Sequence, residues 1–244
     1  MENRRTDMNI FIKHNIPNGC VRSVPCKISI LGMDRAEDLF RLHNDVAEGV
    51  SRDLFSWAAE DELRRFLSDE GFTVGVTYKD RLICARTIRT SEKWIREYLA
   101  ETNRTPECYG NPAITGFCVV DKEFRGNDIQ FLTQYYAESF LIEDFDCILT
   151  TASPNNVHSL QNLLKCGFNI IDMRVNRDNN RRYILKKSLI ENGMISIPGK
   201  KQISIKHLDS QERALKEGYI GFKLITKTHG MDLLFAKLTK DIQE

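Results

Sequence analysis

The chain has 244 residues, of which 41% are hydrophobic and 28% are charged; this is the composition of an ordinary soluble globular protein and excludes disordered and fibrous classes. Lysine and arginine (35) almost balance aspartate and glutamate (34), so the chain lacks the basic excess that drives general nucleic-acid binding. The length fits one large domain, or one domain of about 180 residues with an appendage.

The N-terminus and the cysteines indicate a reduced, cytoplasmic protein. No apolar run follows the basic N-terminal residues, so we expect no signal peptide, and no segment reaches the roughly 18 apolar residues that a spanning helix needs. The seven cysteines contain no C-x-x-C pair, and neither a structural metal nor a disulfide framework is expected. Cys84, Cys118 and Cys147 lie in strand-like runs, where cysteine behaves as a small hydrophobic residue.

The N-terminal region predicts a polar tail, a strand and a capped helix. Residues 1–25 form the expected tail, and residues 27–31 alternate like a half-buried strand. Asp34 and Glu37 have the spacing of a capping box, which places a helix immediately after them. The apolar positions of that helix are Leu39, Leu42 and Val46.

A second helix and a β-hairpin follow. Residues 57–68 fit an amphipathic helix. Its inner face consists of Leu63, Phe66 and Leu67. Two apolar strands, 72–78 and 82–88, flank the turn 79–81 and predict a hairpin. The polar, proline-bearing residues 102–112 then form a loop.

Residues 113–168 carry the most informative pattern. A short apolar strand, 113–120, runs into an Arg-Gly turn and then directly into an amphipathic helix. The apolar stripe of this helix is expected at Ile129, Leu132, Tyr136 and Phe140. A second strand, 147–152, precedes a helix that starts at Asn156, and the segment closes on Gly167 and Phe168.

The order of strand, Arg-Gly turn and helix N-terminus indicates an anion site. The first N–H groups of a helix have no partner within the helix, and the turn presents further N–H groups to the same point. The helix dipole favours negative charge there. This arrangement is suited to holding a phosphate group.

The remaining sequence predicts a second hairpin and a β-rich extension. Residues 168–175 and 182–186 flank a turn of strong turn-forming residues, 176–180. Pro198 and Gly199 mark a break in the chain. Beyond it, residues 189–244 form the extension, whose expected strands are 203–206, 219–225 and 233–238.

In this order of elements, residues 26–188 resemble the GCN5-related N-acetyltransferase (GNAT) superfamily. The spacing from Val120 to Arg125 matches the family pattern, and so does the spacing from Asn156 through Ser159 to Gly167. The resemblance implies an α/β (α+β) fold, with a mixed, mostly antiparallel central sheet flanked by helices and a small C-terminal β-hairpin appendage. It also implies an acyl-CoA as cosubstrate.

The resemblance further implies where the acyl-CoA lies. The strands 113–120 and 147–152 would diverge and admit the pantetheine arm, whose amides would bond the first strand like an added strand. N–H groups of the turn and helix start would surround the pyrophosphate, and the next helix would reach the pantetheine or the thioester. The implied acyl-CoA-binding residues are Cys118, Val119, Val120, Arg125, Gly126, Asn127, Asp128, Ile129, Gln130, Asn156 and Ser159.

Two residues of the turn depart from the family pattern. Asp128 stands where the family usually has glycine, and Gln130 stands where it has glycine or alanine; Gln130 adds bulk but no charge. A carboxylate about 4 Å from a phosphate charge would cost on the order of 4 kcal/mol at an effective dielectric of about 20, unless Arg125 offsets it or Asp128 points away. Aspartate is also a favoured N-cap residue, so we expect Asp128 to cap the following helix.

The proton-transfer residues of many family members are missing. Leu163 stands where a tyrosine is common, and strand 113–120 contains no glutamate. We interpret the polar residues nearby as structural or solvent-facing, namely Glu107, Tyr109, Thr151 and His158. Because water can carry the proton in thioester aminolysis, we assign no catalytic residue and no metal.

The leading hypothesis is an acyl-CoA-dependent N-acyltransferase, in which an amine attacks acetyl-CoA directly. We expect a small-molecule amine rather than a protein, and no nucleic-acid or membrane partner. The alternative is a catalytically silent protein of the same fold that senses CoA ligands or serves in protein contacts. A third interpretation takes Arg125 and Gly126 as a plain helix-entry turn of another α/β fold. Residues 190–244 either roof the acceptor cleft, which we prefer, or pair with a second subunit in a homodimer.

Overall fold

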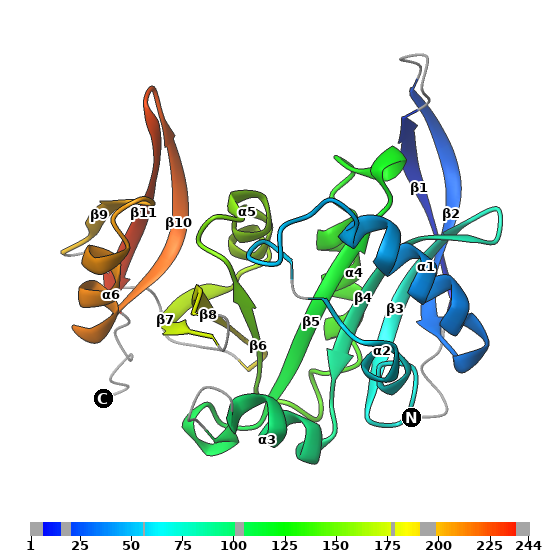
Figure 1. Ribbon diagram of the computed structural model, residues 1–244, viewed down its shortest axis with the longest axis horizontal. Coiled ribbons are helices and arrows are strands. Elements are labelled where there is room, and N and C mark those ends of the chain that lie inside the picture. Colours follow the sequence, from blue (N-terminus) through cyan, green and yellow to red (C-terminus); the bar gives the residue numbers. More distant parts are fainter. Residues whose placement is uncertain are drawn as a thin grey trace. The chain divides into compact units, whose positions relative to one another are not determined.

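The computed structural model describes residues 7–15, 21–55, 57–100, 105–176, 179–190 and 199–237. The chain divides into two compact units (Figure 1). The first unit consists of Met1–Tyr98 and Ala113–Asp144, and the second consists of Leu99–Pro112 and Phe145–Glu244. The domain boundaries expected from the sequence, 1–25, 26–188 and 189–244, stay a prediction.

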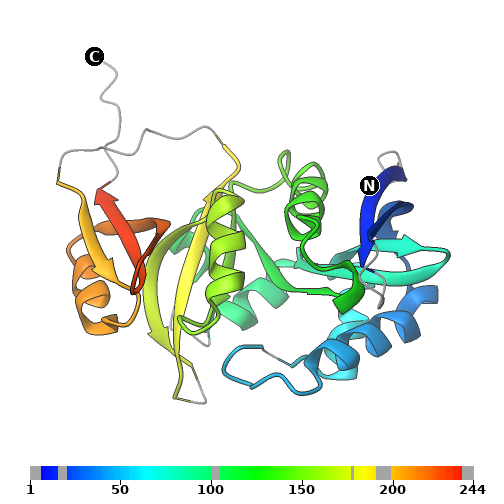
Figure 2. The same ribbon diagram turned by 90° about the horizontal axis from the view of Figure 1, so that it is seen from above.

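The sheet of the first unit is antiparallel, with strands in their chain order. Its strands are β1 (Met8–Asn15), β2 (Val21–Leu31), β3 (Gly71–Tyr78), β4 (Arg81–Arg89) and β5 (Pro112–Val120). The helices near it are α1 (Ala36–Ala47), α2 (Glu60–Arg65), α3 (Glu92–Ala100) and α4 (Ile129–Glu138). Figures 1 and 2 show α1 and α4 on opposite faces of this sheet. The expected hairpin is confirmed as β3 and β4.

The face under α1 carries an apolar core. Leu39 and Leu42 of α1 and Leu63 of α2 pack with residues of the strands beneath them. Burying each such leucine stabilises the fold by roughly 1.5–3 kcal/mol. The core members contributed by strands are Leu31, Leu82, Ala85 and Val119. The expected apolar positions Leu39, Leu42, Leu63, Phe66 and Leu67 are buried.

The expected N-terminal tail contains a strand. β1 pairs with β2 from Met8 opposite Ile28 to Asn15 opposite Val21. Of its side chains only Ile12 is fully buried, at 2% exposure. A single deeply buried position gives a weak alternation signal, because most of this strand is held by main-chain pairing instead of side-chain burial.

The capping box expected at the start of α1 is wrong. The chain enters α1 through a 3₁₀ turn, Met33–Arg35, so Asp34 lies inside this turn and Arg35 occupies the N-cap position without a side-chain cap. Because a capping box needs the acidic residue three positions after the cap, the extra turn moves Asp34 and Glu37 out of register with the helix start.

The stripe expected for α4 is correct at Ile129 and wrong at its other positions. The buried residues are Ile129, Thr133, Gln134 and Ala137, whereas Leu132, Tyr136 and Phe140 are only half-buried. The face that packs on the sheet is therefore shifted toward small and polar residues. Thr133 lies on this buried face because its hydroxyl accepts a hydrogen bond from Arg86 of β4 at 3.2 Å. The polar side chain of the strand therefore requires a polar side chain on the helix face that covers it.

The second unit contains the remaining strands, in the order β6-β8-β7-β10-β11-β9. Their bounds are β6 (Cys147–Ala152), β7 (Asn169–Val175), β8 (Arg181–Ser188), β9 (Lys201–Ser204), β10 (Tyr219–Lys227) and β11 (Gly230–Lys237). The helices are α5 (Val157–Lys165) and α6 (Leu208–Lys216). The C-terminal hairpin is confirmed as β10 and β11. β10 joins β7 at Gly221 opposite Ile170, so the extension continues the sheet of this unit.

No helix among the described residues is long and apolar enough to cross a membrane.

Candidate functional site

The turn between β5 and α4 leaves main-chain N–H groups available. Gly126 has a φ of +80° and Asp128 a φ of +53°, so the chain passes twice through the left-handed region. Within the described ranges, the N–H groups of residues 126–129 have no hydrogen-bond partner. A Cβ added to Gly126 would meet nothing within 4 Å. Such N–H groups, at a helix N-terminus and next to open space, can receive an anion.

Strand β1 anchors this turn through the main-chain N–H and C=O groups of Lys13 and the side chain of Asn15. The Lys13 N–H donates to Asn127 Oδ1 at 2.9 Å, and Asn127 Nδ2 donates back to the Lys13 C=O at 2.6 Å. The same Nδ2 donates to the Phe124 C=O at 2.9 Å, and Asn15 Nδ2 donates to the Arg125 C=O at 3.2 Å. These bonds fix the turn while leaving its N–H groups unused. The sequence analysis missed this role of β1.

A 3₁₀ turn, Lys122–Phe124, supports the same loop. The His14 ring stacks on the Phe124 ring with centroids 4.5 Å apart and planes 5° from parallel. Glu123 Oε2 lies 3.4 Å from His14 Nε2 and 3.1 Å from an Arg81 nitrogen. The hydrogen bond to His14, followed by those to Arg81, holds the pKa of Glu123 below its usual value.

The main-chain groups of β5 alternate in direction. The Phe117 N–H donates to Thr87 Oγ1 at 3.1 Å and the Asp121 N–H donates to the Ile83 C=O at 2.8 Å, so residues 117, 119 and 121 face β4. Cys118 and Val120 therefore direct their N–H and C=O groups away from β4. Arg125 Nε donates to the Val120 C=O at 3.1 Å, which ties the turn to the end of this strand.

A β-bulge lies near the middle of β5. The pairing register shifts between Arg86 and Ile88, so residues 116 and 117 of β5 oppose Thr87. A Cβ at Gly116 would lie 2.5 Å from Thr87 Oγ1, so a side chain there would displace Thr87. Bulges redirect side chains, often next to functional sites. Here Phe117 contacts the rings of His43 and Phe55, with centroids 5.0 and 6.1 Å away.

His43 of α1 is a neutral part of this aromatic surface. Its side chain is fully buried, and burial lowers its pKa. Nε2 accepts the Ala58 N–H at 3.3 Å, which leaves the ring proton on Nδ1, facing Asn44 Oδ1 at 3.2 Å. The neighbouring Trp57 is 47% exposed. The α1 side of the bulge is therefore apolar and aromatic, with no free base at His43.

The cap expected from Asp128 is not formed. Asp128 occupies the N-cap position of α4, but its side chain accepts no cap hydrogen bond. An N-cap side chain reaches the helix N–H groups from extended backbone, whereas Asp128 has φ 53° and ψ 21°. The left-handed conformation, which aspartate tolerates better than most residues, gives an exposed carboxylate beside partnerless N–H groups.

The start of α5, in the second unit, is capped. Asn156 is the N-cap residue, and its Oδ1 accepts the Ser159 N–H at 3.0 Å. His158 is exposed. Tyr109 is buried, and its carbonyl accepts hydrogen bonds from Lys186 Nζ at 3.1 Å and Cys147 Sγ at 3.3 Å. Because Asn156 caps α5, the asparagine at this position is explained in part by helix capping and not only by a contact with acyl-CoA.

A buried arginine that the sequence analysis did not single out lies beneath α4. Arg86 is 4% exposed, and its guanidinium donates to Thr133 Oγ1 at 3.2 Å, to Thr115 Oγ1 at 3.3 Å and to the Gln130 C=O at 2.7 Å. The available signal was an arginine in the middle of an otherwise apolar strand, residues 82–88. Arg86 anchors the first turn of α4.

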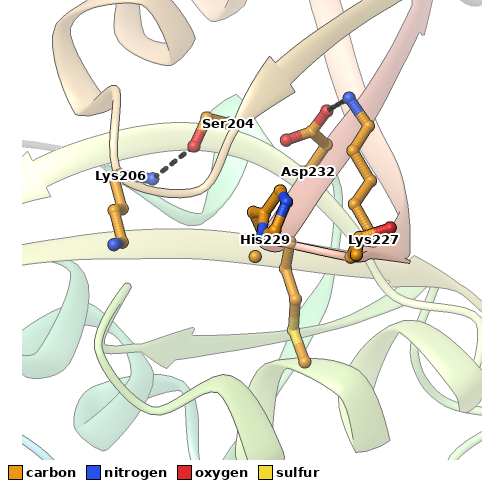
Figure 3. Close-up of a pocket in the computed structure, with 8 residues that line it drawn as sticks. Ser204, Lys206, Lys227, His229 and Asp232 are labelled. Carbon is orange, nitrogen blue, oxygen red and sulfur yellow. Dashed lines mark hydrogen bonds and ion pairs between the residues drawn. The ribbon is translucent and has the colours of Figure 1, made fainter.

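The second unit contains a pocket of about 330 Å³, lined by Ser204, Lys206 and residues 227–232 (Figure 3). Lys227 forms an ion pair with Asp232, and Gln202 Nε2 donates to the same carboxylate at 2.8 Å. The charge of Lys227 is thus matched within the pocket. In the part of the chain that the structure describes, no cluster of three or more His, Cys, Asp or Glu side chains could hold a metal ion.

Comparisons with known proteins identify the fold. No protein-family model matches the sequence, and no curated protein sequence matches it. An N-acetyltransferase from Staphylococcus aureus Mu50 gives a TM-score of 0.53 at 14% identity, over 68% of this chain and 99% of its own. A GNAT-family acetyltransferase from Streptococcus pneumoniae gives 0.51 at 15% identity, over 67% and 98%. The ribosomal-protein-S18-alanine N-acetyltransferase from Escherichia coli gives 0.51 at 9% identity, over 70% and 99%.

These structures cover about two thirds of this chain and nearly all of their own. The expected fold class is confirmed: the chain has the fold of the GNAT superfamily, with a mostly antiparallel sheet flanked by helices. At these identities the likeness concerns the fold, and function must be argued from the site.

Proposed function

We propose that the protein is an acyl-CoA-dependent N-acetyltransferase that moves an acetyl group from acetyl-CoA to an amine. The observation that supports this best is the turn between β5 and α4, where the N–H groups of residues 126–129 have no partner among the described residues and lie beside open space at Gly126. A diphosphate needs several such donors at one place.

The main chain of β5 supports the same proposal. The N–H and C=O groups of Cys118 and Val120 point away from β4, as the alternation requires. A pantetheine arm carries two amides and can pair with a strand through these groups. Cys118, Val119 and Val120 would then contact the arm, residues 125–130 the pyrophosphate, and Asn156 with Ser159 the region near the thioester.

The reaction we propose is direct attack of the amine nitrogen on the thioester carbonyl in a ternary complex. The carbon–nitrogen bond forms as the carbon–sulfur bond breaks, the amine proton passes to water, and CoA leaves as the thiol. Leu163 and the strand 113–120 supply neither the tyrosine nor the glutamate of many family members, so catalysis would rest on proximity and on a polarised carbonyl. The acceptor is a small amine, for which the aromatic surface at Phe117 offers apolar contact.

Asp128 favours a second candidate, a catalytically silent protein of this fold that senses CoA ligands. Its exposed carboxylate lies where the phosphate would bind and is not used as a cap. A carboxylate near the phosphate weakens binding, although solvent screens much of the repulsion, and weaker binding suits a low-affinity sensor.

Calorimetry with acetyl-CoA and CoA, followed by turnover with a panel of small amines, tests both candidates. Binding with release of free CoA thiol in the presence of an amine supports the transferase. Binding of both ligands without turnover favours the sensor. Absence of binding would overturn both, because each needs the anion-receptive turn.

A further inference from the structure

Arg86 carries a buried positive charge that no carboxylate of the described residues matches. Its guanidinium bonds only neutral oxygens, those of Thr115, Thr133 and Gln130. Among the described residues it forms no ion pair, although ion pairs surround many other arginines of the chain. Buried charges are normally paired, because an isolated one is costly to desolvate. The surroundings of Arg86 should therefore contain a group that can carry negative charge.

The sheet register places such a group directly opposite. Arg86 pairs with Cys118 of β5. Because the main-chain groups of Cys118 face away from β4, the two residues form a non-hydrogen-bonded pair, in which opposed side chains approach most closely. Cys118 Sγ also lies 3.9 Å from Thr133 Oγ1, so both side chains lie on the face that α4 covers.

A second thiol completes the cluster. Cys84 precedes Arg86 by two residues and shares its face of β4, and its Sγ lies 4.0 Å from Cys118 Sγ. Cys84 is fully buried, whereas Cys118 is partly exposed. Cys118 is the less buried of the two residues, and Cys84 can donate its S–H to the Cys118 sulfur.

We propose that Cys118 is a thiolate that reacts with hydroperoxides, with the buried Arg86 guanidinium as its counter-charge and Cys84 as its hydrogen-bond donor. Reactive cysteines are found in such electropositive, partly exposed surroundings. The hydrogen bond from Cys84 and the charge of Arg86, against the opposing effect of burial, lower the pKa of Cys118 below its usual value. Burial raises the pKa of Cys84.

The chemical step is a two-electron oxidation of the sulfur. The Cys118 thiolate attacks one peroxide oxygen, the O–O bond breaks, and hydroxide or alkoxide leaves and takes a proton from water. The products are a Cys118 sulfenic acid and water or an alcohol. Attack by the neighbouring Cys84 thiol would convert the sulfenic acid to a disulfide and release a second water.

The test is the pH dependence of alkylation, measured thiol by thiol in the reduced, full-length protein. The protein is pulsed with iodoacetamide from pH 5 to 9 and mapped by peptide mass spectrometry. Cys118 should show a midpoint below the usual thiol pKa of about 8.5. Cys147, a buried strand cysteine whose pKa burial raises to about 11, is the internal reference and should not react below pH 9. Restricted access lowers the rate at every pH but leaves the midpoint unchanged.

Matched variants separate the two interactions that stabilise the thiolate, namely the charge of Arg86 and the hydrogen bond from Cys84. Arg86→Lys keeps a cation and should keep a low midpoint, while Arg86→Met should raise it by about one pH unit or more. Cys84→Ala and Cys84→Ser test the other interaction, and they keep the proposal testable should Arg86→Met fail to fold: the serine keeps a donor and a low midpoint, whereas the alanine removes the donor and should raise the midpoint. A Cys118 midpoint at or above the usual thiol pKa of about 8.5 in the unmodified sequence overturns the proposal.

Hydroperoxide treatment identifies the product. Dimedone should label Cys118, or a disulfide should link Cys118 to Cys84. Dimedone labelling of Cys118 in Cys84→Ala shows that Cys118 is the attacking thiol, and modification of Cys118 no faster than Cys147 overturns the proposal. If the main chain of Cys118 also contacts acyl-CoA, as the proposed function has it, oxidation weakens acetyl-CoA binding. Oxidation is measured without that ligand, so the two proposals can fail separately.

Discussion

The helices α4 and α5 begin in opposite ways, although the sequence predicts a CoA contact at both. At α5 the Asn156 side chain accepts the Ser159 N–H at 3.0 Å, so the helix supplies its own cap. At α4 the N-cap residue Asp128 is left-handed and caps nothing. A helix N-terminus whose N–H groups are capped by a side chain gains stability, whereas uncapped N–H groups remain available to bind a ligand.

The two ends also differ in what holds the preceding chain. The α4 turn is tied to β1 through Asn127, to β5 through Arg125 and to β4 through Arg86. These bonds use carbonyl groups and side chains and leave the N–H groups unused. A rigid frame of this kind lowers the entropic cost of ordering donors around a ligand. We therefore expect substitutions at the α4 turn to change ligand affinity more than stability, and the reverse at α5.

The largest effect is expected for Gly126→Val. A β-branched residue at φ +80° costs about 1–2 kcal/mol of stability, and its side chain would occupy the open space beside the N–H groups. Loss of several charge-assisted hydrogen bonds should weaken acetyl-CoA binding on the order of 100-fold. Gly218→Val is the control, because Gly218 has φ +83° and also faces open space, but lies outside the proposed site. Equal acetyl-CoA affinity in the two variants would contradict the proposed role of the turn.

Asn127→Ala tests the hydrogen bonds that hold the α4 turn in place and leaves the N–H donors of the turn intact. It removes the hydrogen bonds to Lys13 and Phe124, which should cost about 1–2 kcal/mol of stability and weaken acetyl-CoA binding about tenfold. Asn176→Ala removes a turn bond to the Asn180 N–H and serves as the control in urea unfolding and calorimetry. Similar acetyl-CoA affinities for both variants would show that β1 does not pre-order the site.

The features of this site that depend on residues adjacent in the sequence were predicted better than those that depend on distant residues. The Arg-Gly turn between a strand and a helix is set by neighbouring residues, and its place was predicted correctly. The backbone angle of Asp128 was not, because aspartate suits both a capping and a left-handed position. The capping box predicted at Asp34 was wrong for a similar reason, because a short 3₁₀ turn shifts the helix start without changing the residue pattern.

The features that the sequence analysis missed depend on distant partners. The role of β1 follows from bonds between residues more than 100 positions apart, such as Lys13 and Asn127. Cys118 was interpreted as a small hydrophobic residue, like Cys147. Only the strand register, which brings Arg86 opposite Cys118, separates the two. Arg86 itself could have been noticed, since a charge inside an apolar strand needs a partner.

At α5 the expected effect is on stability. Asn156→Ala removes the cap and should lower the free energy of unfolding by about 1 kcal/mol. Asn156→Asp keeps an acceptor for the Ser159 N–H and should restore stability, while it replaces the amide donor. If Asn156 also contacts acetyl-CoA, the aspartate variant binds it about threefold more weakly at unchanged stability. Affinity equal to that of the unmodified sequence would mean that Asn156 acts only as a cap.

The smallest effect is expected at Asp128, and its sign is the informative part. Asparagine and glycine both remove the carboxylate and both tolerate the left-handed backbone. Because the side chain is exposed, repulsion of a phosphate is largely screened, so these variants should bind acetyl-CoA about two- to fivefold more tightly at low salt. Alanine removes the same charge but is strained at φ 53°, so it should match them in affinity and fall below them in stability.

Salt separates charge from shape in this series. At about 1 M salt the Debye length falls to about 3 Å, and the affinity gain of Asp128→Asn over aspartate should disappear. A gain that persists there would come from the shape of the loop, and no gain at low salt would mean that the carboxylate points away from the ligand. With either of these two results, the Asp128 side chain would neither bond the N–H groups of the turn nor repel the ligand. The backbone conformation of residues 126–128 would then be what keeps these N–H groups available.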